Sequence, residues 1–315
     1  MIILNGYLKN KMDEEMFNMG NAIKLKPAIK DYIWGGTYFK KYNKGDTDII
    51  AECWELSVRD DFNCVLADSN KPLKEILTKD MLGPNCDRFP YFPLLIKLID
   101  AYDNLSVQVH PSDDYALKNE HSFGKSEMWH IIGVDEGAGL YVGFKKDCSK
   151  EEVKQSLKDG SILNLLNLFK VKPGETYIIN PGTIHAIGKG VRLIEIQQNS
   201  DLTYRLYDYN RVGKDGNPRP LHIEKALNVI SFKKYELVQP TNGVLGSNQY
   251  FHVVKKEFDG ELEVSANEGS FVSFTFIEGQ GLVDDIPFNV YDTFFLPNGK
   301  SCKVKGKGIV ILSRV

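Results

Sequence analysis

Short runs of β-branched and aromatic residues, each bounded by Gly, Pro, Asp or Asn, recur through most of the 315-residue chain. Runs of this length and composition predict β-strands. Their spacing leaves little room for crossover helices, which favours an antiparallel sandwich or barrel over βαβ units. The strands expected in the first two thirds of the chain are Leu94–Leu98, Ser106–Val109, Trp129–Gly133, Leu140–Phe144, Thr176–Ile179, Val191–Ile196 and Leu202–Leu206.

One segment departs from this pattern and predicts helix. Ser149 is followed three residues later by Glu152, which is the spacing of a capping box. An apolar stripe then runs from Val153 to Leu166, interrupted by Asp159 and Gly160. We expect two short helices here and two elsewhere, at Lys150–Lys158, Ile162–Leu168, Pro72–Asp80 and Ile223–Val229.

Turn-forming residues between Phe232 and Gln249 predict a domain boundary. A second series of strands follows, and it contains one histidine, His252. We therefore expect an N-terminal extension at 1–21, a larger domain at 22–235 with a helical insertion around 149–168, and a smaller β domain without a metal site at 245–315. The strands expected in this last part are His252–Phe258, Glu261–Val264, Phe271–Ile277, Thr293–Leu296 and Ile309–Ser313.

The composition is that of an ordinary soluble protein, with 42% apolar residues, 26% charged residues and a net charge of −3. That charge gives no general attraction for nucleic acid or anionic membranes. No apolar run approaches the roughly 18–20 residues that a spanning helix needs. The five cysteines are odd in number and form no CxxC pair, which argues against a disulfide framework and an all-cysteine zinc site. We expect reduced thiols in a cytoplasmic protein.

Four residues have the types and local settings of metal ligands. Gln108 and His110 are two apart on a predicted strand, so both side chains project to the same face. His185 follows a Pro-Gly turn, and Glu127 would add a carboxylate. Two imidazoles, a carboxylate and an amide oxygen suit Zn²⁺, and Fe²⁺ or Mn²⁺ would fit a similar set. Each histidine alone is also explained as a hydrogen-bonded structural residue, and spacing does not decide between the two interpretations.

Several charged residues stand close to these candidates in the sequence. Lys97, Lys125, Arg205 and Arg211 would suit an anionic ligand, above all phosphate, although solvated surface charges are the plainer interpretation. Glu195 lies inside an apolar predicted strand, where a carboxylate is either paired with a cation or functional.

These motifs, in this order, resemble type I mannose-6-phosphate isomerase in its shorter bacterial form, within the cupin superfamily. The resemblance runs from about Ala22 to the C-terminus, and the first 20 or so residues match nothing in the family. The long form's larger helical domain is absent. The matching stretches are Trp34–Gly36, Ala51–Ser57, Phe89–Ala101, Leu105–Pro111, Gly124–Trp129, Pro181–Ala186 and Leu193–Arg211.

The resemblance implies a mainly β fold of two cupin-like jelly-roll β-barrels with a short helical insertion, in which 22–235 is the catalytic cupin domain. It also implies one Zn²⁺ per chain and a catalytic arginine at Arg205. The zinc ligands that it implies are Gln108, His110, Glu127 and His185. Gln108 stands where the general cupin pattern has a second histidine, so it is the weakest of the four. The phosphate contacts that the resemblance implies are Lys97, Ser106 and Arg211.

The reaction implied is interconversion of mannose 6-phosphate and fructose 6-phosphate through a cis-enediol. Glu195 is the first candidate for the base and Lys125 the second. We expect a small-molecule sugar phosphate as partner, no nucleic acid or membrane, and a monomer or weak homodimer. Two rival interpretations are a non-catalytic sugar-binding cupin and a cupin oxygenase that uses Fe²⁺.

Overall fold

The computed structural model describes residues 21–213, 215–237, 240 and 243–315, and β-strands predominate in them. The prediction of a mainly β fold is therefore confirmed. The described strands form three sheets, each open in its hydrogen-bond order. Closure into two jelly-roll barrels stays a prediction. The proposed extension at 1–21 lies outside the described residues, apart from Asn21.

The β12 sheet is the middle layer of the molecule, and its strand order is β10-β7-β12-β5-β3-β2. All of its neighbouring strands are antiparallel. Its strands are β10 (Thr176–Ile179), β7 (Glu127–Val134), β12 (Val191–Gln198), β5 (Leu94–Ala101), β3 (Glu52–Leu56) and β2 (Ala28–Lys30).

The β6 sheet faces one side of the β12 sheet and has the order β13-β6-β11-β8-β9. Apolar side chains from both sheets meet in one core cluster, which includes Ile99, Trp129 and Val142. Its strands are β13 (Tyr204–Tyr207), β6 (Val107–Val109), β11 (His185–Ile187), β8 (Gly139–Phe144) and β9 (Leu166–Lys170).

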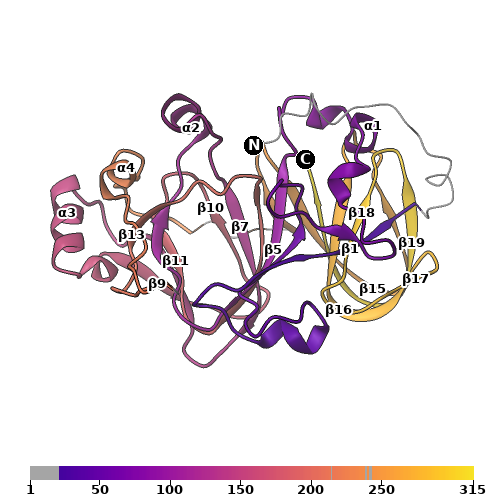
Figure 1. The fold of residues 1–315 in the computed structure, drawn as a ribbon, viewed down its shortest axis with the longest axis horizontal. Helices are drawn as coiled ribbons and strands as arrows, with labels where there is room; N and C mark the ends of the chain where they lie inside the picture. The colour runs from indigo at the N-terminus through magenta and orange to yellow at the C-terminus, as the bar shows by residue number, and fades with distance from the viewer. Residues whose placement is uncertain (1–20, 214, 238–239, 241–242) are drawn as a thin grey trace.

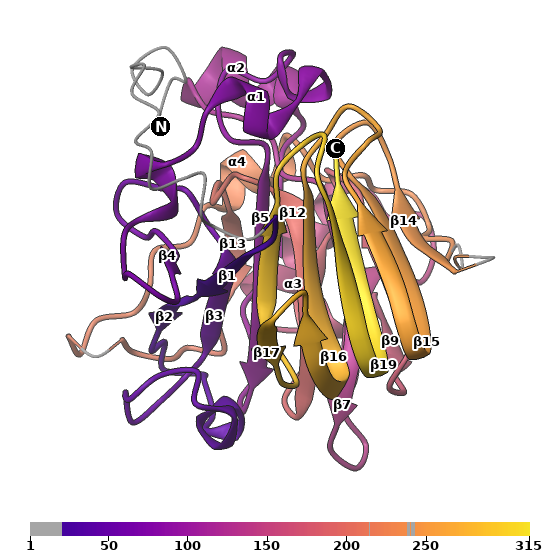
Figure 2. The same cartoon turned by 90° about the vertical axis from the view of Figure 1, so that its right-hand side faces the viewer.

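The β19 sheet contains most of the C-terminal strands, and Figure 2 shows β15, β19 and β16 side by side as long bent ribbons. Its order is β14-β15-β19-β16-β18-β1-β4, and β17 pairs with β16. Its strands are β14 (Val244–Ser247), β15 (His252–Ser265), β19 (Ser301–Arg314), β16 (Val272–Val283), β18 (Thr293–Leu296), β1 (Ile23–Lys26), β4 (Val65–Leu66) and β17 (Ile286–Phe288).

The two ends of the described chain meet in the β19 sheet. Strand β1 pairs with β18, with Ile23 opposite Phe295, and the indigo strand lies beside the yellow ones in Figure 1. A second core cluster joins residues of β1, β5 and β12 to Val253 and Ile311 of the C-terminal strands. The division at 235–245 stays a prediction, but the C-terminal sheet takes two strands from the N-terminal part.

The helices agree only in part with the expectation. Helix α3 (Lys150–Lys158) has the predicted bounds, and Ser149 and Glu152 form the predicted capping box. The second predicted helix of this insertion was wrong: Ile162–Asn164 is one 3₁₀ turn, and Leu166–Lys170 is strand β9, because its backbone pairs with β8. The other helices are α1 (Lys79–Leu82), α2 (Asp113–Glu120) and α4 (Ile223–Leu227), with further 3₁₀ turns at Tyr38–Tyr42, Leu73–Glu75 and Pro84–Cys86.

Candidate metal centre and active site

Strand register places three of the predicted site residues in a row on the β6 sheet. Gln108 of β6 lies directly opposite His185 of β11 on one side and Arg205 of β13 on the other. Residues that pair directly across a sheet point to the same face. The amide, the imidazole and the guanidinium therefore project together toward the β12 sheet.

A second row faces it from the β12 sheet. Glu195 of β12 lies opposite Trp129 of β7 and Lys97 of β5, and Lys97 lies opposite Trp54 of β3. Glu127 is two residues before Trp129 on β7, so it shares this face. The space between the two rows holds the candidate centre.

His110, Glu127 and His185 converge in that space. One ligand atom from each lies within 4.8 Å of the others, and all three side chains are buried. The Nε2 atom of His185 is 3.3 Å from Glu127 Oε1, and that of His110 is 3.6 Å from Oε2. Among the described residues, this is the one group of three or more His, Cys, Asp or Glu side chains with such geometry.

The backbone sets the tautomer of both imidazoles. His110 donates from Nδ1 to the carbonyl of Leu202 at 3.0 Å, and His185 donates from Nδ1 to that of Thr183 at 2.8 Å. In the neutral ring this leaves Nε2 unprotonated and turned toward Glu127, as in metal-binding histidines. Burial, with the Lys125 ammonium, lowers the pKa of His110 to about 4, and burial lowers the pKa of His185. Both rings are therefore neutral near pH 7.

The Glu127 carboxylate is fully buried, and neither oxygen accepts a hydrogen bond from the described residues. Burial would raise its pKa, but the Lys125 ammonium holds the pKa of Glu127 well below its ordinary value. The Lys125 ammonium lies 2.7 Å from Oε2 and 3.2 Å from Nε2 of His110. An ionised carboxylate without hydrogen bonds beside two Nε2 lone pairs fits a cation-binding site.

Gln108, the fourth predicted ligand, lies at the edge of the group formed by the other three. Its side-chain amide nitrogen is 3.3 Å from Nε2 of His185, and the residue is only partly buried. Rotation of the amide by half a turn would place its oxygen at this position instead. Gln108 thus borders the three-residue cluster.

Glu195 and the two lysines form one network beside the cluster. Glu195 Oε1 lies 3.2 Å from the Lys97 ammonium and 3.8 Å from that of Lys125, and Oε2 accepts from Trp129 Nε1. Lys97 has a second partner, Glu52, at 3.6 Å. Burial would lower the pKa of Lys97, but Glu195 and Glu52 raise it above its usual range, so the amine stays charged.

Of the remaining predicted residues, Arg205 lies beside Gln108 on the neighbouring strand. Arg205 donates from Nε to the Ser106 hydroxyl at 3.2 Å and from Nη1 to the Pro220 carbonyl at 3.1 Å. Arg211 lies 2.6 Å from Asp208, and Asp208 also binds Arg219. Glu52, Asp208 and Arg219 were not predicted as site residues from the sequence. One local pattern could have drawn attention to Arg219: it directly follows Gly216-Asn217-Pro218, a sequence that predicts a turn.

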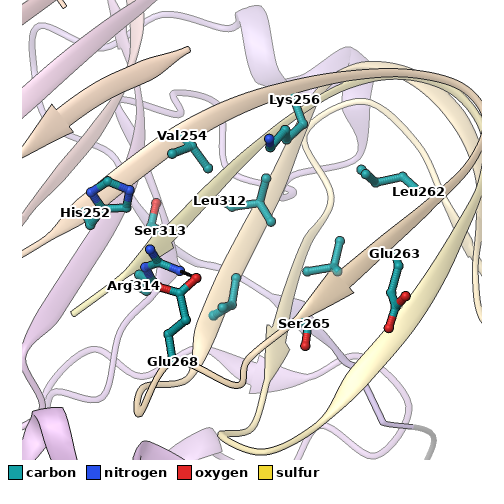
Figure 3. A pocket seen from close by; sticks show the side chains of 12 residues that line it. His252, Val254, Lys256, Leu262, Glu263, Ser265, Glu268, Leu312, Ser313 and Arg314 are labelled. Atoms are coloured by element: carbon teal, nitrogen blue, oxygen red, sulfur yellow. Dashed lines mark ion pairs between the residues drawn. The ribbon is translucent and has the colours of Figure 1, made fainter. Parts of the chain in front are cut away.

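A separate cavity of about 270 Å³ opens on the C-terminal strands, as Figure 3 shows. Its floor is apolar, with Val254, Leu262 and Leu312, and Arg314 pairs with Glu268 at its rim. Each of the residues that line it comes from the segments 252–272 and 312–314, so it shares no residue with the candidate centre. His130, three residues after Glu127 on β7, hydrogen-bonds Thr176 at 2.8 Å.

The fold and this buried centre define a mainly β protein with a candidate metal site between two sheets. The family model described as phosphomannose isomerase type I, catalytic domain, matches residues 22–126. A mannose-6-phosphate isomerase of Streptococcus mutans is 33% identical over 299 residues, which cover 89% of this chain and 93% of that protein. The chain therefore belongs to the type I phosphomannose isomerase family, a family of enzymes.

Solved structures agree with this assignment. The crystal structure of the mannose 6-phosphate isomerase from Bacillus subtilis superposes with a TM-score of 0.83 at 34% identity, covering 93% of this chain and 99% of that one. A mannose 6-phosphate isomerase crystallised with zinc and yttrium has the same fold, with a TM-score of 0.74 at 16% identity and coverage of 93% and 99%. No helix among the described residues is long and apolar enough to cross a membrane.

Proposed function

We propose that this chain is a zinc-dependent aldose–ketose isomerase that interconverts mannose 6-phosphate and fructose 6-phosphate through a cis-enediol(ate). The supporting observation is the convergence of two unprotonated Nε2 atoms on the Glu127 carboxylate, next to strand β13, which carries the Arg205 guanidinium. A cupin architecture of two jelly-roll barrels is part of this proposal. So are the cytoplasmic location and the monomer or weak homodimer expected from the sequence.

His110, Glu127 and His185 would hold one Zn²⁺, with Gln108 as a weaker fourth ligand. When bound, Zn²⁺ supplies Lewis-acid polarisation of the sugar oxygens. The zinc-bound isomerase of the same fold supports this choice of metal. Neutral imidazoles and an ionised carboxylate are the ligand forms that zinc requires near pH 7.

Arg205 would stabilise the negative charge that develops on the sugar oxygens when a proton leaves carbon. Its guanidinium keeps its proton, and its contacts with Ser106 and Pro220 fix its orientation before the substrate binds. Such a pre-oriented cation needs no reorganisation during the reaction. This gives Arg205 a catalytic role that is separate from metal binding.

Glu195 is the first candidate for the base that moves the proton between C2 and C1, and Lys125 is the second, with ring opening as its other role. Both face the same space as the metal cluster, and their charged groups are 3.8 Å apart. Glu195→Gln and Lys125→Met can be compared by the exchange of the C2 proton of mannose 6-phosphate with deuterated water. The variant that loses exchange identifies the base, whereas exchange in both would exclude both assignments.

The phosphate end of the substrate would lie at the cluster of guanidiniums beside Ser106. We propose Ser106, Arg211 and Arg219 as its contacts, because guanidinium groups bind phosphate bidentately. Lys97 was also predicted as a phosphate contact. Its ammonium already pairs with Glu195 and Glu52, so a phosphate would have to compete with two carboxylates for it.

A coupled assay with mannose 6-phosphate, before and after removal of metal by a chelator, tests the proposed function. We expect turnover that is lost on chelation and regained with Zn²⁺. Absence of turnover by zinc-loaded protein would contradict the isomerase, and full turnover by metal-free protein would contradict the metal. The same two results separate it from a non-catalytic cupin, whereas O₂ consumption by the Fe²⁺-loaded protein without any isomerisation would favour the oxygenase alternative.

A further inference from the structure

The chain leaves strand β13 through a tight turn that carries a buried carboxylate. Asp208 follows the strand directly, and its carbonyl accepts from the backbone N–H of Arg211 at 3.0 Å. Between them Tyr209 and Asn210 have φ values of 56° and 55°. Two successive left-handed residues turn the chain as in a type I′ turn. Tyrosine rarely adopts this conformation, and such strain often marks a functional segment.

The turn brings two arginines to the same carboxylate. Arg211 lies in the turn, whereas Arg219 lies beyond a hairpin closed by pairing of Val212 with Pro218. Asp208 accepts from Arg211 Nη2 at 2.6 Å, and from Arg219 Nη2 and Nε at 2.6 and 2.8 Å. The contact with Arg219 is therefore bidentate, which fixes the plane of the guanidinium.

The Asp208 side chain is more buried than the two arginine side chains that bind it. Its side chain is 5% exposed, compared with 16% for Arg211 and 25% for Arg219. Burial would raise its pKa, but Arg219 and Arg211 hold the pKa of Asp208 below its usual value. The carboxylate is thus ionised and enclosed, with the two guanidiniums as the more exposed layer.

A third guanidinium completes the group. Arg205 donates to the carbonyl of Pro220, the residue after Arg219, and its backbone pairs with His222 on the same returning segment. Asp103 provides a second carboxylate, 3.4 Å from Arg211, but it is 48% exposed. Three guanidiniums therefore lie near two carboxylates, one enclosed and one exposed, which leaves positive charge available to an anion.

We propose that Asp208 is a positioning residue that holds Arg211 and Arg219 in the arrangement that a phosphomonoester dianion binds. An arginine side chain loses much rotamer freedom when it is fixed on a ligand, and this loss weakens binding. Asp208 removes that freedom before the substrate arrives. The inference rests on the proposed function for the identity of the substrate, but the phosphate-binding role can be measured without turnover.

The test compares Asp208→Asn with Asp215→Asn, a matched control in the same hairpin whose carboxylate contacts Asn217. For zinc-loaded protein we expect KM for mannose 6-phosphate to rise about tenfold in Asp208→Asn, with kcat within about twofold. Inorganic phosphate, titrated by calorimetry, should bind correspondingly more weakly. Asp215→Asn should match the wild type in all three measurements.

A double-mutant cycle separates positioning from a general effect on folding. If Asp208 acts through Arg219 as well as Arg211, combining Asp208→Asn with Arg219→Gln should raise KM by less than the product of the two single effects. Additive effects, an unchanged KM and phosphate affinity, or a fall in KM would each overturn the inference. If wild-type protein binds phosphate in this way but does not turn over mannose 6-phosphate, the proposed function fails and the positioning role stands.

Discussion

Glu127 and His185 meet across the two facing sheets, with Oε1 of the carboxylate 3.3 Å from Nε2 of the imidazole. Because the His185 ring donates its Nδ1 proton to a backbone carbonyl, this contact joins a carboxylate to an unprotonated nitrogen. Such a contact is unfavourable for the two groups alone and favourable with a cation between them. The relationship leads to the first prediction.

Glu127→Gln should lower zinc affinity by at least about tenfold, because even partners that only orient metal ligands contribute that much. The amide keeps the shape of the side chain and removes its charge. Equilibrium dialysis with measurement of bound zinc checks this. His252→Gln on the C-terminal strands serves as the matched control and should bind zinc as the wild type does. Wild-type affinity in Glu127→Gln would remove this residue from the ligand set.

Arg205→Ala should lower kcat by about 10²–10³, as the loss of one fixed electrostatic donor does, while zinc content stays intact. The guanidinium is assigned to the charge that develops on the substrate and to no metal contact. Arg314→Ala, which removes an arginine paired with Glu268 on the far sheet, is the control. Loss of zinc from Arg205→Ala would move Arg205 from catalysis to the structure of the centre.

The sequence predicted strands well where apolar runs are short and bounded by turns, as for β10 and β18, which have the predicted bounds. It failed where local signals conflict with pairing. Asp259-Gly260 suggested a break, but β15 continues to Ser265 because Gly260 lies opposite Gly306 and the two strands bend together. Leu166–Lys170 follows a helical stripe in sequence, yet it forms a strand because β8 offers it an edge.

For the site residues too, the sequence predicted local relationships but not those that depend on strand pairing. Spacing of two residues on one strand was enough to place Gln108 and His110 on one face. It could not give the register that sets Glu195 opposite Lys97, or that sets His185 opposite Gln108, because these pairings join segments far apart in the chain. The same reason applies to two ion-pair partners that only the folded chain reveals. Glu52 is the second partner of Lys97, and Asp208 is the shared partner of Arg211 and Arg219.

His130 should make stability depend on pH. Burial lowers its pKa from 6.5 to about 4. Between pH 4 and pH 6.5 the His130 ring is therefore protonated in the unfolded chain and neutral in the folded chain. Stability should therefore be constant above about pH 6.5 and fall as the pH drops toward 4, by up to on the order of 3 kcal/mol from this residue. Urea unfolding of the wild type and of His130→Gln across this range measures it. Parallel curves for the two proteins would show that His130 does not contribute.

Lys44 and Glu55 form a buried ion pair. The two groups are 2.9 Å apart with side chains 4% and 0% exposed, and Lys44 also donates to the carbonyl of Tyr291 next to β18. Burial raises the pKa of Glu55 even though Lys44 opposes this. The pair thus connects the segment before β3 to the C-terminal sheet.

Removing one partner leaves an uncompensated buried charge, so Lys44→Met should destabilise the fold by about 3–5 kcal/mol. Replacing both, with Lys44→Met and Glu55→Leu, should cost less than the single change, because apolar groups of similar size need no partner. The exposed pair of Lys307 and Asp259, at 2.7 Å, is the control, and Lys307→Met should change stability little. Denaturant unfolding measures all three variants. A double variant that is less stable than Lys44→Met would mean that the Glu55 carboxylate stabilises the fold by itself, and not through charge balance with Lys44.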